Sequence, residues 1–400
     1  MLSALAAAAW IAVLARWLGG DDFGDLMLLV ALSTIFAALA DGGVSVEVCR
    51  QVGEHPQSAR AVFGCALRVR LAFAVPAMIL LSAAYLSVSD RRSFAALVLI
   101  LVSTVATMLH QLSIATFRSA GMRRIEPIAD TLPRLAILVV GISLGREHVG
   151  LVMAAGLYAC ADLALAAVML RSMSRSLVGT EAAPEPDAFS PRRLVRRGVG
   201  LGLWSLQQRA LVWVVALLTG GPEIARFAAA QRAADAALLP ASAVGIVSVP
   251  QVASSNPSDR RGTLAMLVSI AFAVDIPVAI IGLVNGGGLA GFAFGQELRA
   301  AGPTITVLLL AVPIAGAGQV LVQVAAAIEP QRQLRAALLS VVAMLAVAIV
   351  AVPSHGAVGA AVAALSGHVV LVVALAPLLW SSTEPLADER ILAASRSMSS

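Results

Sequence analysis

The chain has 400 residues, of which 59% are hydrophobic and only 13% are charged, and its formal net charge at pH 7 is +5. Soluble domains are about 45–50% apolar and about 25% charged. Together with a mean hydropathy of +0.90, this composition excludes a soluble globular protein and predicts an integral membrane protein whose excess apolar surface is covered by lipid. The modest positive charge does not require a nucleic-acid partner, and we expect none.

Apolar runs long enough to cross a bilayer follow one another along almost the whole chain. They lack the alternating pattern of β-barrel strands, so we expect helices. The runs cover about residues 2–18, 25–42, 61–88, 93–117, 131–145, 150–171, 198–219, 223–252, 263–285, 303–327, 333–352 and 357–380. The sequence therefore predicts an all-α polytopic membrane protein with about twelve transmembrane helices.

The two halves of the chain resemble each other. Gly19–Phe23 joins spans one and two as Gly220–Ile224 joins spans seven and eight, and Gly150–Ala155 opens span six as Gly356–Ala361 opens span twelve. Two six-helix units in the same orientation imply a parallel repeat. We predict an N-terminal lobe over residues 1–171, a C-terminal lobe over 198–382 and a tail over 383–400. The proline- and arginine-containing stretch 172–197 is predicted to be a flexible linker between the lobes.

Arginine distribution predicts the orientation of the chain. The linker alone carries Arg192, Arg193, Arg196 and Arg197, and the loops on the same side of the predicted membrane hold far more arginines than those on the other side. Positive residues concentrate in cytoplasmic loops. We therefore expect both termini and the linker in the cytoplasm.

The cysteines do not indicate a metal site or a disulfide framework. Cys49, Cys65 and Cys160 are far apart, odd in number, and form no Cys-x-x-Cys pair. We expect no metal and no cofactor.

Several short motifs, in a fixed order over nearly the whole chain, carry a family resemblance. They are Ala15–Gly19 with Phe23–Gly24, Gly220–Glu223, Phe227–Arg232 with Leu239–Pro240, Phe294–Glu297 with Ala300–Ala301, and Pro353–Ala361. In these features the chain resembles the polysaccharide and oligosaccharide flippases of the multidrug/oligosaccharidyl-lipid/polysaccharide (MOP) exporter superfamily. It departs from their pattern in lacking a basic segment before the first span.

The resemblance implies a function and its partners. A MATE-like transporter fold of two lobes around a cavity is implied, located in the bacterial inner membrane. The implied substrate is a polyprenyl-diphosphate-linked oligosaccharide, moved from the inner to the outer leaflet by alternating access. Membrane lipid, H+ or Na+ as a coupling ion, and other membrane proteins of polysaccharide assembly are the remaining expected partners. No enzymatic activity is implied.

Polar residues inside the spans are the candidates for substrate binding, because a charge in mid-membrane usually faces a cavity or a partner. Ser205, Gln208 and Arg209 share one face of span seven, and a guanidinium matches the geometry of a diphosphate. The alternative for Arg209 is a structural pair with a buried acid.

Further candidates lie on spans three, five and ten. Arg68 and Arg70 point to different faces of span three, where the alternatives are snorkelling to lipid headgroups and capture of the diphosphate. Gln319 and Gln323 lie four residues apart on span ten, and either bond neighbouring helices or contact sugar hydroxyls. Arg134 is expected to snorkel from the edge of span five.

Three aspartates are candidates for ion coupling. Asp275 lies in mid-span, two residues before Pro277, and Asp162 lies in the middle of span six. Asp235 is three residues from Arg232, so an intrahelical ion pair is its structural alternative.

Two rival functions are distinguished by sequence features. A cation-coupled multidrug exporter of the same superfamily predicts an acidic or apolar cavity, whereas the spans here carry arginines. A membrane-embedded polymerase or glycosyltransferase predicts a large external loop, and the sequence contains none between its spans. A membrane scaffold without transport activity is compatible with the sequence.

Overall fold

The computed structural model describes residues 2–88, 93–121, 125–176, 189–255 and 259–379. Within these ranges every regular element is helical. The predicted tail 383–400 and residues 177–188 of the predicted linker lie outside them. The α-helices are α1 (Leu2–Asp41), α2 (Val44–Glu54), α3 (Ala59–Val88), α4 (Phe94–Ser119), α5 (Ile125–Leu144), α6 (Leu151–Ser176), α7 (Pro191–Leu218), α8 (Gly221–Ala237), α9 (Leu239–Ser254), α10 (Arg260–Phe294), α11 (Gly302–Ile328) and α12 (Pro330–Leu375).

These helices account for the predicted spans. Among the described residues, seven helices are long and apolar enough to cross a bilayer, or eight if the bent pair α8 and α9 forms one span. Two of the seven, α1 and α12, reverse direction at an internal glycine and so supply two spans each. With the shorter apolar helices Thr131–Leu144 and Gly202–Leu218, the described part of the chain reaches the twelve spans predicted from the sequence.

Helix α12 is a hairpin that turns at Gly356. Its backbone there has φ 54° and ψ −130°, outside the helical region. The Ser340 hydroxyl donates to the carbonyl of Gly367 at 2.9 Å, although the two residues are 27 positions apart. A continuous helix would separate them by about 40 Å. The two arms therefore run antiparallel, and only a residue that tolerates positive φ can form the turn.

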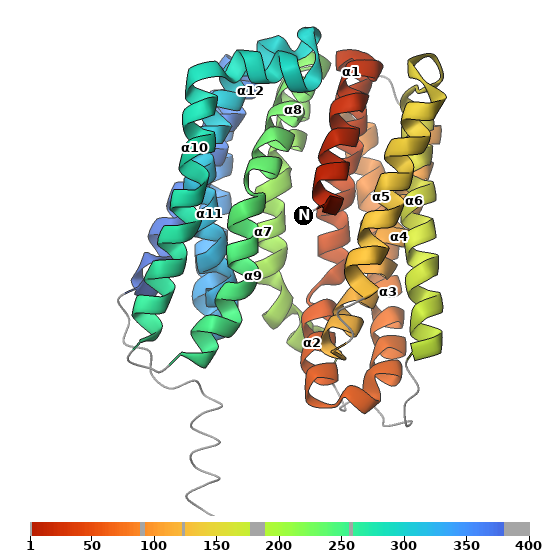
Figure 1. Ribbon diagram of the computed structural model, residues 1–400, viewed down its shortest axis with the longest axis vertical. Helices are drawn as coiled ribbons and strands as arrows, with labels where there is room; N and C mark the ends of the chain where they lie inside the picture. The colour runs from red at the N-terminus through yellow and green to blue at the C-terminus, as the bar shows by residue number, and fades with distance from the viewer. Residues whose placement is uncertain (1, 89–92, 122–124, 177–188, 256–258, 380–400) are drawn as a thin grey trace, which may run out of the picture.

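Helix α1 reverses in the same way at Gly19, which has φ 73° and ψ 171°. Ala7 and Ala37, on its two arms, line one cavity. In Figure 1 the chain starts near mid-height, rises to the top of the view through the first arm, and descends through the second toward α2. We call the end that carries the Gly19 and Gly356 reversals the turn end. The opposite end, where α6 ends and α7 begins, is the linker end.

The helices form two bundles that meet along α1. Helices α1–α6 lie on one side of Figure 1 and α7–α12 on the other, and we refer to them as the N-terminal and C-terminal lobes. Across the boundary α1 packs against α7 and α8. Near the turn end, a Cβ added at Gly24 would lie 3.1 Å from the Gly221 carbonyl oxygen and 3.6 Å from the Ala225 Cβ atom. The absence of side chains at Gly24 and Gly221 lets the two lobes approach to backbone contact.

Replacing Gly356 by alanine should destabilise the α12 hairpin. A methyl group there would force a non-glycine residue into positive φ and would meet the Glu223 carboxylate, which accepts a hydrogen bond from the Ala357 N–H at 2.8 Å. We expect a loss of about 1–3 kcal/mol, measured as a lower thermal midpoint of the purified protein in detergent. Gly20→Ala is the matched control, because no atom lies within 4 Å of an added Cβ. Equal midpoints for the two variants would contradict the assignment of the reversal to Gly356.

Candidate substrate cavity

A cavity of about 730 Å³ lies in the N-terminal lobe, beside its border with the C-terminal lobe and in the half of the bundle toward the linker end. Its walls come mainly from α1, α2, α4, α5 and α6, with α7 and α8 closing the side toward the C-terminal lobe. Trp10 and Tyr158 contribute aromatic surface, and the other lining residues mix apolar with polar side chains. The polar residues that line it are Ser33, Thr34, Asp41, Ser45, Cys49, Ser103, Thr107, Gln111, Arg118, Arg134, Asp162, Ser205 and Arg232.

The N-terminal lobe presents both charge signs to this cavity. Arg134 follows Pro133 within α5, and Arg118 lies in the last turn of α4. Asp162 on α6 accepts a hydrogen bond from the Ser103 hydroxyl on α4. A sugar or phosphate in the cavity would therefore meet guanidinium donors and hydroxyls on one wall.

The C-terminal lobe contributes an ion triad at the boundary between α7 and α8. Asp235 Oδ2 lies 2.7 Å from Arg209 Nη1 and 3.3 Å from Arg232 Nη1. One carboxylate thus serves two guanidiniums, which leaves the triad with one formal positive charge. Arg232 is the member that lines the cavity. Asp235 also borders a smaller internal cavity of about 40 Å³, together with Gln207, Gln208 and His368.

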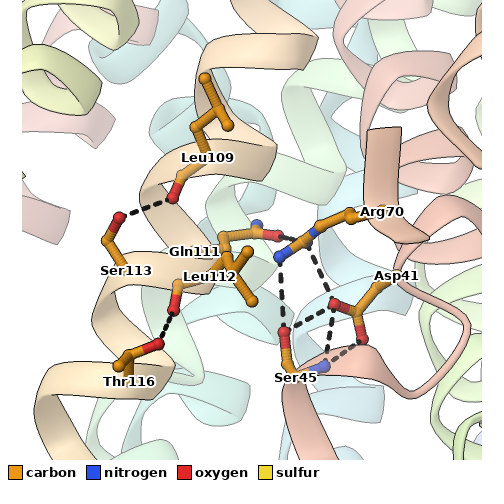
Figure 2. Close-up of polar contacts among 8 residues, drawn as sticks. All are labelled: Asp41, Ser45, Arg70, Leu109, Gln111, Leu112, Ser113 and Thr116. Atoms are coloured by element: carbon orange, nitrogen blue, oxygen red, sulfur yellow. Dashed lines mark hydrogen bonds and ion pairs between the residues drawn. The ribbon is translucent and has the colours of Figure 1, made fainter. Parts of the chain in front are cut away.

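Arg70 is buried in a polar cluster behind the cavity wall (Figure 2). Only 2% of its side chain is exposed, and its Nη2 lies 3.2 Å from Asp41 Oδ1 and 3.1 Å from Gln111 Oε1. Asp41 also accepts a 2.6 Å hydrogen bond from the Ser45 hydroxyl. The cluster ties α3 to the junction of α1 with α2 and to α4. Asp41, Ser45 and Gln111 line the cavity, so Arg70 positions three of its polar residues.

The other predicted substrate residues lie away from the cavity. Arg68 is exposed on α3, as expected for a side chain that reaches the headgroups. The carbonyl of Gln208 accepts a hydrogen bond from Gln231 on α8. Gln319 on α11 accepts a 3.1 Å hydrogen bond from Ser242 on α9, and the side chain of Gln323 lies beside Gly245. The Gln319 side chain therefore joins α11 to α9, and Gln208 takes part in a contact between α7 and α8 through its main chain.

Among the residues proposed from sequence, the described cavity lining includes Ser205 and Asp162 but not Arg209, Gln208, Arg68, Arg70, Gln319 or Gln323. It adds Arg118, Arg134 and Arg232. The i, i+3 pair of Arg232 with Asp235 was predicted and is confirmed. For Arg209 the structure shows the alternative, an ion pair with an acid; that the acid is Asp235, 26 residues later on another helix, was not predictable. The expectation that Arg134 only snorkels from the edge of its span is wrong, since the residue lines the cavity.

The predicted ion-coupling aspartates have different surroundings. Asp162 and Asp235 are bonded as described above. Asp275, on α10, is fully buried, and neither of its carboxyl oxygens has a hydrogen-bond partner among the described residues. It lies against Gly316 on α11.

Removing Arg70 should destabilise the N-terminal lobe. Arg70→Ala would leave the Asp41 carboxylate without its guanidinium, and breaking a buried ion pair costs about 3–5 kcal/mol. Because Asp41 is 20% exposed, we expect the lower part of that range. Thermal unfolding of the purified protein measures the effect, and Arg68→Ala is the matched control two residues away. The double variant Arg70→Ala with Asp41→Ala should regain part of the loss; no recovery would contradict the pairing.

Cysteines at Gly24 and Ala225 should form a disulfide that fixes the turn end closed. The 3.6 Å separation of their Cβ positions lies within the range of natural disulfides, and the new Cβ at Gly24, 3.1 Å from the Gly221 carbonyl oxygen, requires the helices to shift by a few tenths of an ångström. With the three native cysteines replaced, oxidation should cross-link the lobes, seen by mass spectrometry of the intact protein. A Gly20→Cys and Ala225→Cys pair is the control, since nothing lies within 4 Å of Gly20. Equal cross-linking of both pairs would show that the contact is not specific.

Comparison with solved structures shows the same fold in membrane transporters. An inward-facing multidrug resistance MATE family transporter of the MOP superfamily matches with a TM-score of 0.72 at 17% identity, over 94% of this chain and 92% of the other. The lipid II flippase MurJ, in its inward closed conformation, matches with a TM-score of 0.74 at 13% identity, over 95% and 86%. A MOP superfamily transporter from Pyrococcus furiosus, described as having a binding pocket of reverse polarity, matches with a TM-score of 0.69 at 14% identity, over 96% and 94%.

Sequence comparison gives the family. No curated protein is similar enough in sequence to count as a match. Residues 1–250, more than half of the chain, match the family described as polysaccharide biosynthesis protein. With its apolar helices, its MATE-like fold and this match, the chain is a multi-pass membrane protein that belongs to the polysaccharide biosynthesis protein family.

Proposed function

We propose that the protein is a flippase that moves a polyprenyl-diphosphate-linked oligosaccharide from the inner to the outer leaflet of the bacterial inner membrane. The observation that carries the proposal is the cavity at the lobe border, which is lined by Arg134 of the N-terminal lobe and Arg232 of the C-terminal lobe. Family membership supports a role in polysaccharide synthesis. The likeness to a lipid II flippase supports a transporter rather than an enzyme.

The charges of the cavity suit an anionic headgroup. A diphosphate accepts charge-assisted hydrogen bonds from guanidinium groups, which are stronger than neutral ones. Arg232 can turn toward such a ligand without leaving Asp235 alone, since Arg209 remains 2.7 Å from the same oxygen. Ser33, Thr34 and Ser205 supply hydroxyls for the sugar. The polyprenyl chain stays in lipid throughout.

Alternating access requires that the lobes open at one end while they close at the other. Here the turn end is closed by the contact of Gly24 with Gly221 and by the Arg16 guanidinium, which donates to the carbonyl of Phe292 across the lobe boundary. If the arginine-rich linker end is cytoplasmic, as the sequence predicts, this conformation has its cavity toward the inner leaflet. Rocking of the lobes about α1, α7 and α8 would then expose the substrate on the outer side.

A multidrug exporter is the second candidate, because MATE transporters share the fold. The lining arginines favour an anion over a cationic drug. H+ or Na+ coupling is compatible with both functions, and other membrane proteins of polysaccharide assembly are the expected partners of the first.

Replacing Arg232 by alanine should weaken substrate binding while the protein stays folded. A hydrogen bond to a charged group contributes about 1.5–3 kcal/mol, so we expect about 10- to 100-fold weaker binding of a polyprenyl-diphosphate-linked sugar to purified protein. Arg134→Ala should act in the same direction. Arg232→Lys should lose less, because an ammonium still attracts phosphate without the bidentate fork.

The control variant is Arg68→Ala, which removes an arginine from the outer surface of α3 and should leave binding unchanged. Flipping in proteoliposomes should follow binding. Unchanged affinity in Arg232→Ala and Arg134→Ala would contradict the proposal. Tight binding of a cationic dye that survives both substitutions would favour the multidrug exporter.

A further inference from the structure

One buried carboxyl group is used by neither the cavity nor the ion triad. Asp275 lies near the middle of α10, has 0% exposure, and has no hydrogen-bond partner at either oxygen within the described part of the chain. By contrast, Asp162 accepts a hydrogen bond from Ser103 within the N-terminal lobe, and Asp235 forms ion pairs with Arg209 and Arg232 within the C-terminal lobe. Asp275 is therefore the member of the three predicted ion-coupling aspartates whose charge nothing nearby compensates.

Asp275 lies where three helices of the C-terminal lobe meet. A Cβ added at Gly316 on α11 would be 2.5 Å from Asp275 Oδ2 and 2.8 Å from the Ala241 Cβ atom on α9. One turn along α11 from Gly316, Gln319 bonds Ser242, the residue after Ala241. Described residues of α9 and α11 include no titratable side chain.

Charged groups on the other elements that touch α10 are distant or already paired. Arg16 contacts the carbonyl of Phe292, which lies beyond the break of α10 at Asn285, and Asn285 alone is ten residues or about 15 Å of helix from Asp275. Glu297 and Arg299 lie beyond the same end of α10, and Arg260 and Arg261 lie at its other end. The charged residues of α8 form ion pairs with one another and with Arg209.

These surroundings favour a neutral carboxylic acid. Burying an ionised carboxylate without donors costs several kcal/mol, and a group in such a site takes up a proton instead. A hard metal cation would need several oxygen ligands. Within the described residues, α9 and α11 supply no second carboxylate, so an anionic set of side-chain ligands for such a cation is lacking there.

We propose that Asp275 is a proton-binding site of the C-terminal lobe, occupied in the conformation described here and emptied when α10 and α11 separate. A proline near Asp275 in each of α10 and α11 allows both helices to bend there. Pro277 lies two residues after Asp275 in α10, and Pro313 lies three residues before Gly316 in α11. Each removes a main-chain hydrogen bond to the preceding turn. Ionisation of Asp275 favours water entry and therefore separation of the two bent helices.

The proton links Asp275 to the state of the lobes, and this part of the inference rests on the proposed alternating access. When α10 and α11 are packed, the acid stays protonated and the turn end stays closed. Loss of the proton favours the other conformation. The coupling ion is then H+, bound outside the substrate cavity.

Infrared spectroscopy of the full-length protein in liposomes tests the site directly. The wild-type protein should show the carbonyl band of a protonated, buried carboxylic acid at neutral pH, and the band should disappear as pH rises. Asp275→Asn should lose it, whereas Asp162→Asn and Asp235→Asn should retain it. A wild-type protein without the band, or a band that persists in Asp275→Asn, would overturn the proposal. Failure of Asp275→Asn to fold would also count against it, because the neutral amide has the size of the protonated acid.

The coupling has a separate readout in the Gly24→Cys and Ala225→Cys pair. Cross-linking at the turn end should decrease as pH rises, and adding Asp275→Asn should keep it high at every pH. Cross-linking that depends on pH equally in both proteins would refute a role for Asp275. If the infrared band and the pH-dependent cross-linking are observed but no lipid-linked sugar is flipped, the proposed substrate is wrong and the proton site stands. If sugar is flipped but neither the band nor the pH dependence is observed, the proton site is wrong and the proposed substrate stands.

Discussion

The arrangement of the whole molecule depends on the close contact of α1 with α8 at the turn end. In lipid there is no hydrophobic driving force between helices, so association relies on packing and on residues small enough to let backbones meet. Gly24 and Gly221 provide this on the two lobes. The cavity lies away from this contact, toward the linker end.

The charged side chains inside the bundle are neutralised to three different degrees. Arg70 is neutralised by Asp41 and supported by Gln111 and Ser45, so it behaves as part of the scaffold. The triad of Arg209, Arg232 and Asp235 is only partly neutralised and lies beside the cavity. Asp275 is isolated, and only the loss of its own charge makes its burial inexpensive. A full counter-charge thus accompanies the structural role of Arg70, a partial one accompanies the binding role proposed for the triad, and none accompanies the proton-binding role proposed for Asp275.

The sequence predicts features that depend on residues close together in the chain, and it does not predict contacts between helices far apart in the chain. The spans, and the assignment of Arg68 and Arg70 to different faces of α3, follow from hydropathy and helical periodicity, which are local properties. The pairing of Arg232 with Asp235 is also local. The triad and the contact of Asp275 with Gly316 depend on how helices far apart in sequence are rotated against each other, and no local pattern contains that rotation. For the same reason Arg134, three residues after the start of its predicted span, gave no sign that it lines the cavity.

The reversals at Gly19 and Gly356 have a consequence for what the protein shows to its surroundings. Each connects two spans through a single non-helical residue, and the connection between α7 and α8 is hardly longer. These three connections therefore offer little polypeptide for an antibody or protease to bind. The connection between α10 and α11 is longer, because it contains a 3-10 helix over Gln296–Ala301. A soluble protein that binds the turn end would therefore contact that segment rather than the two reversals.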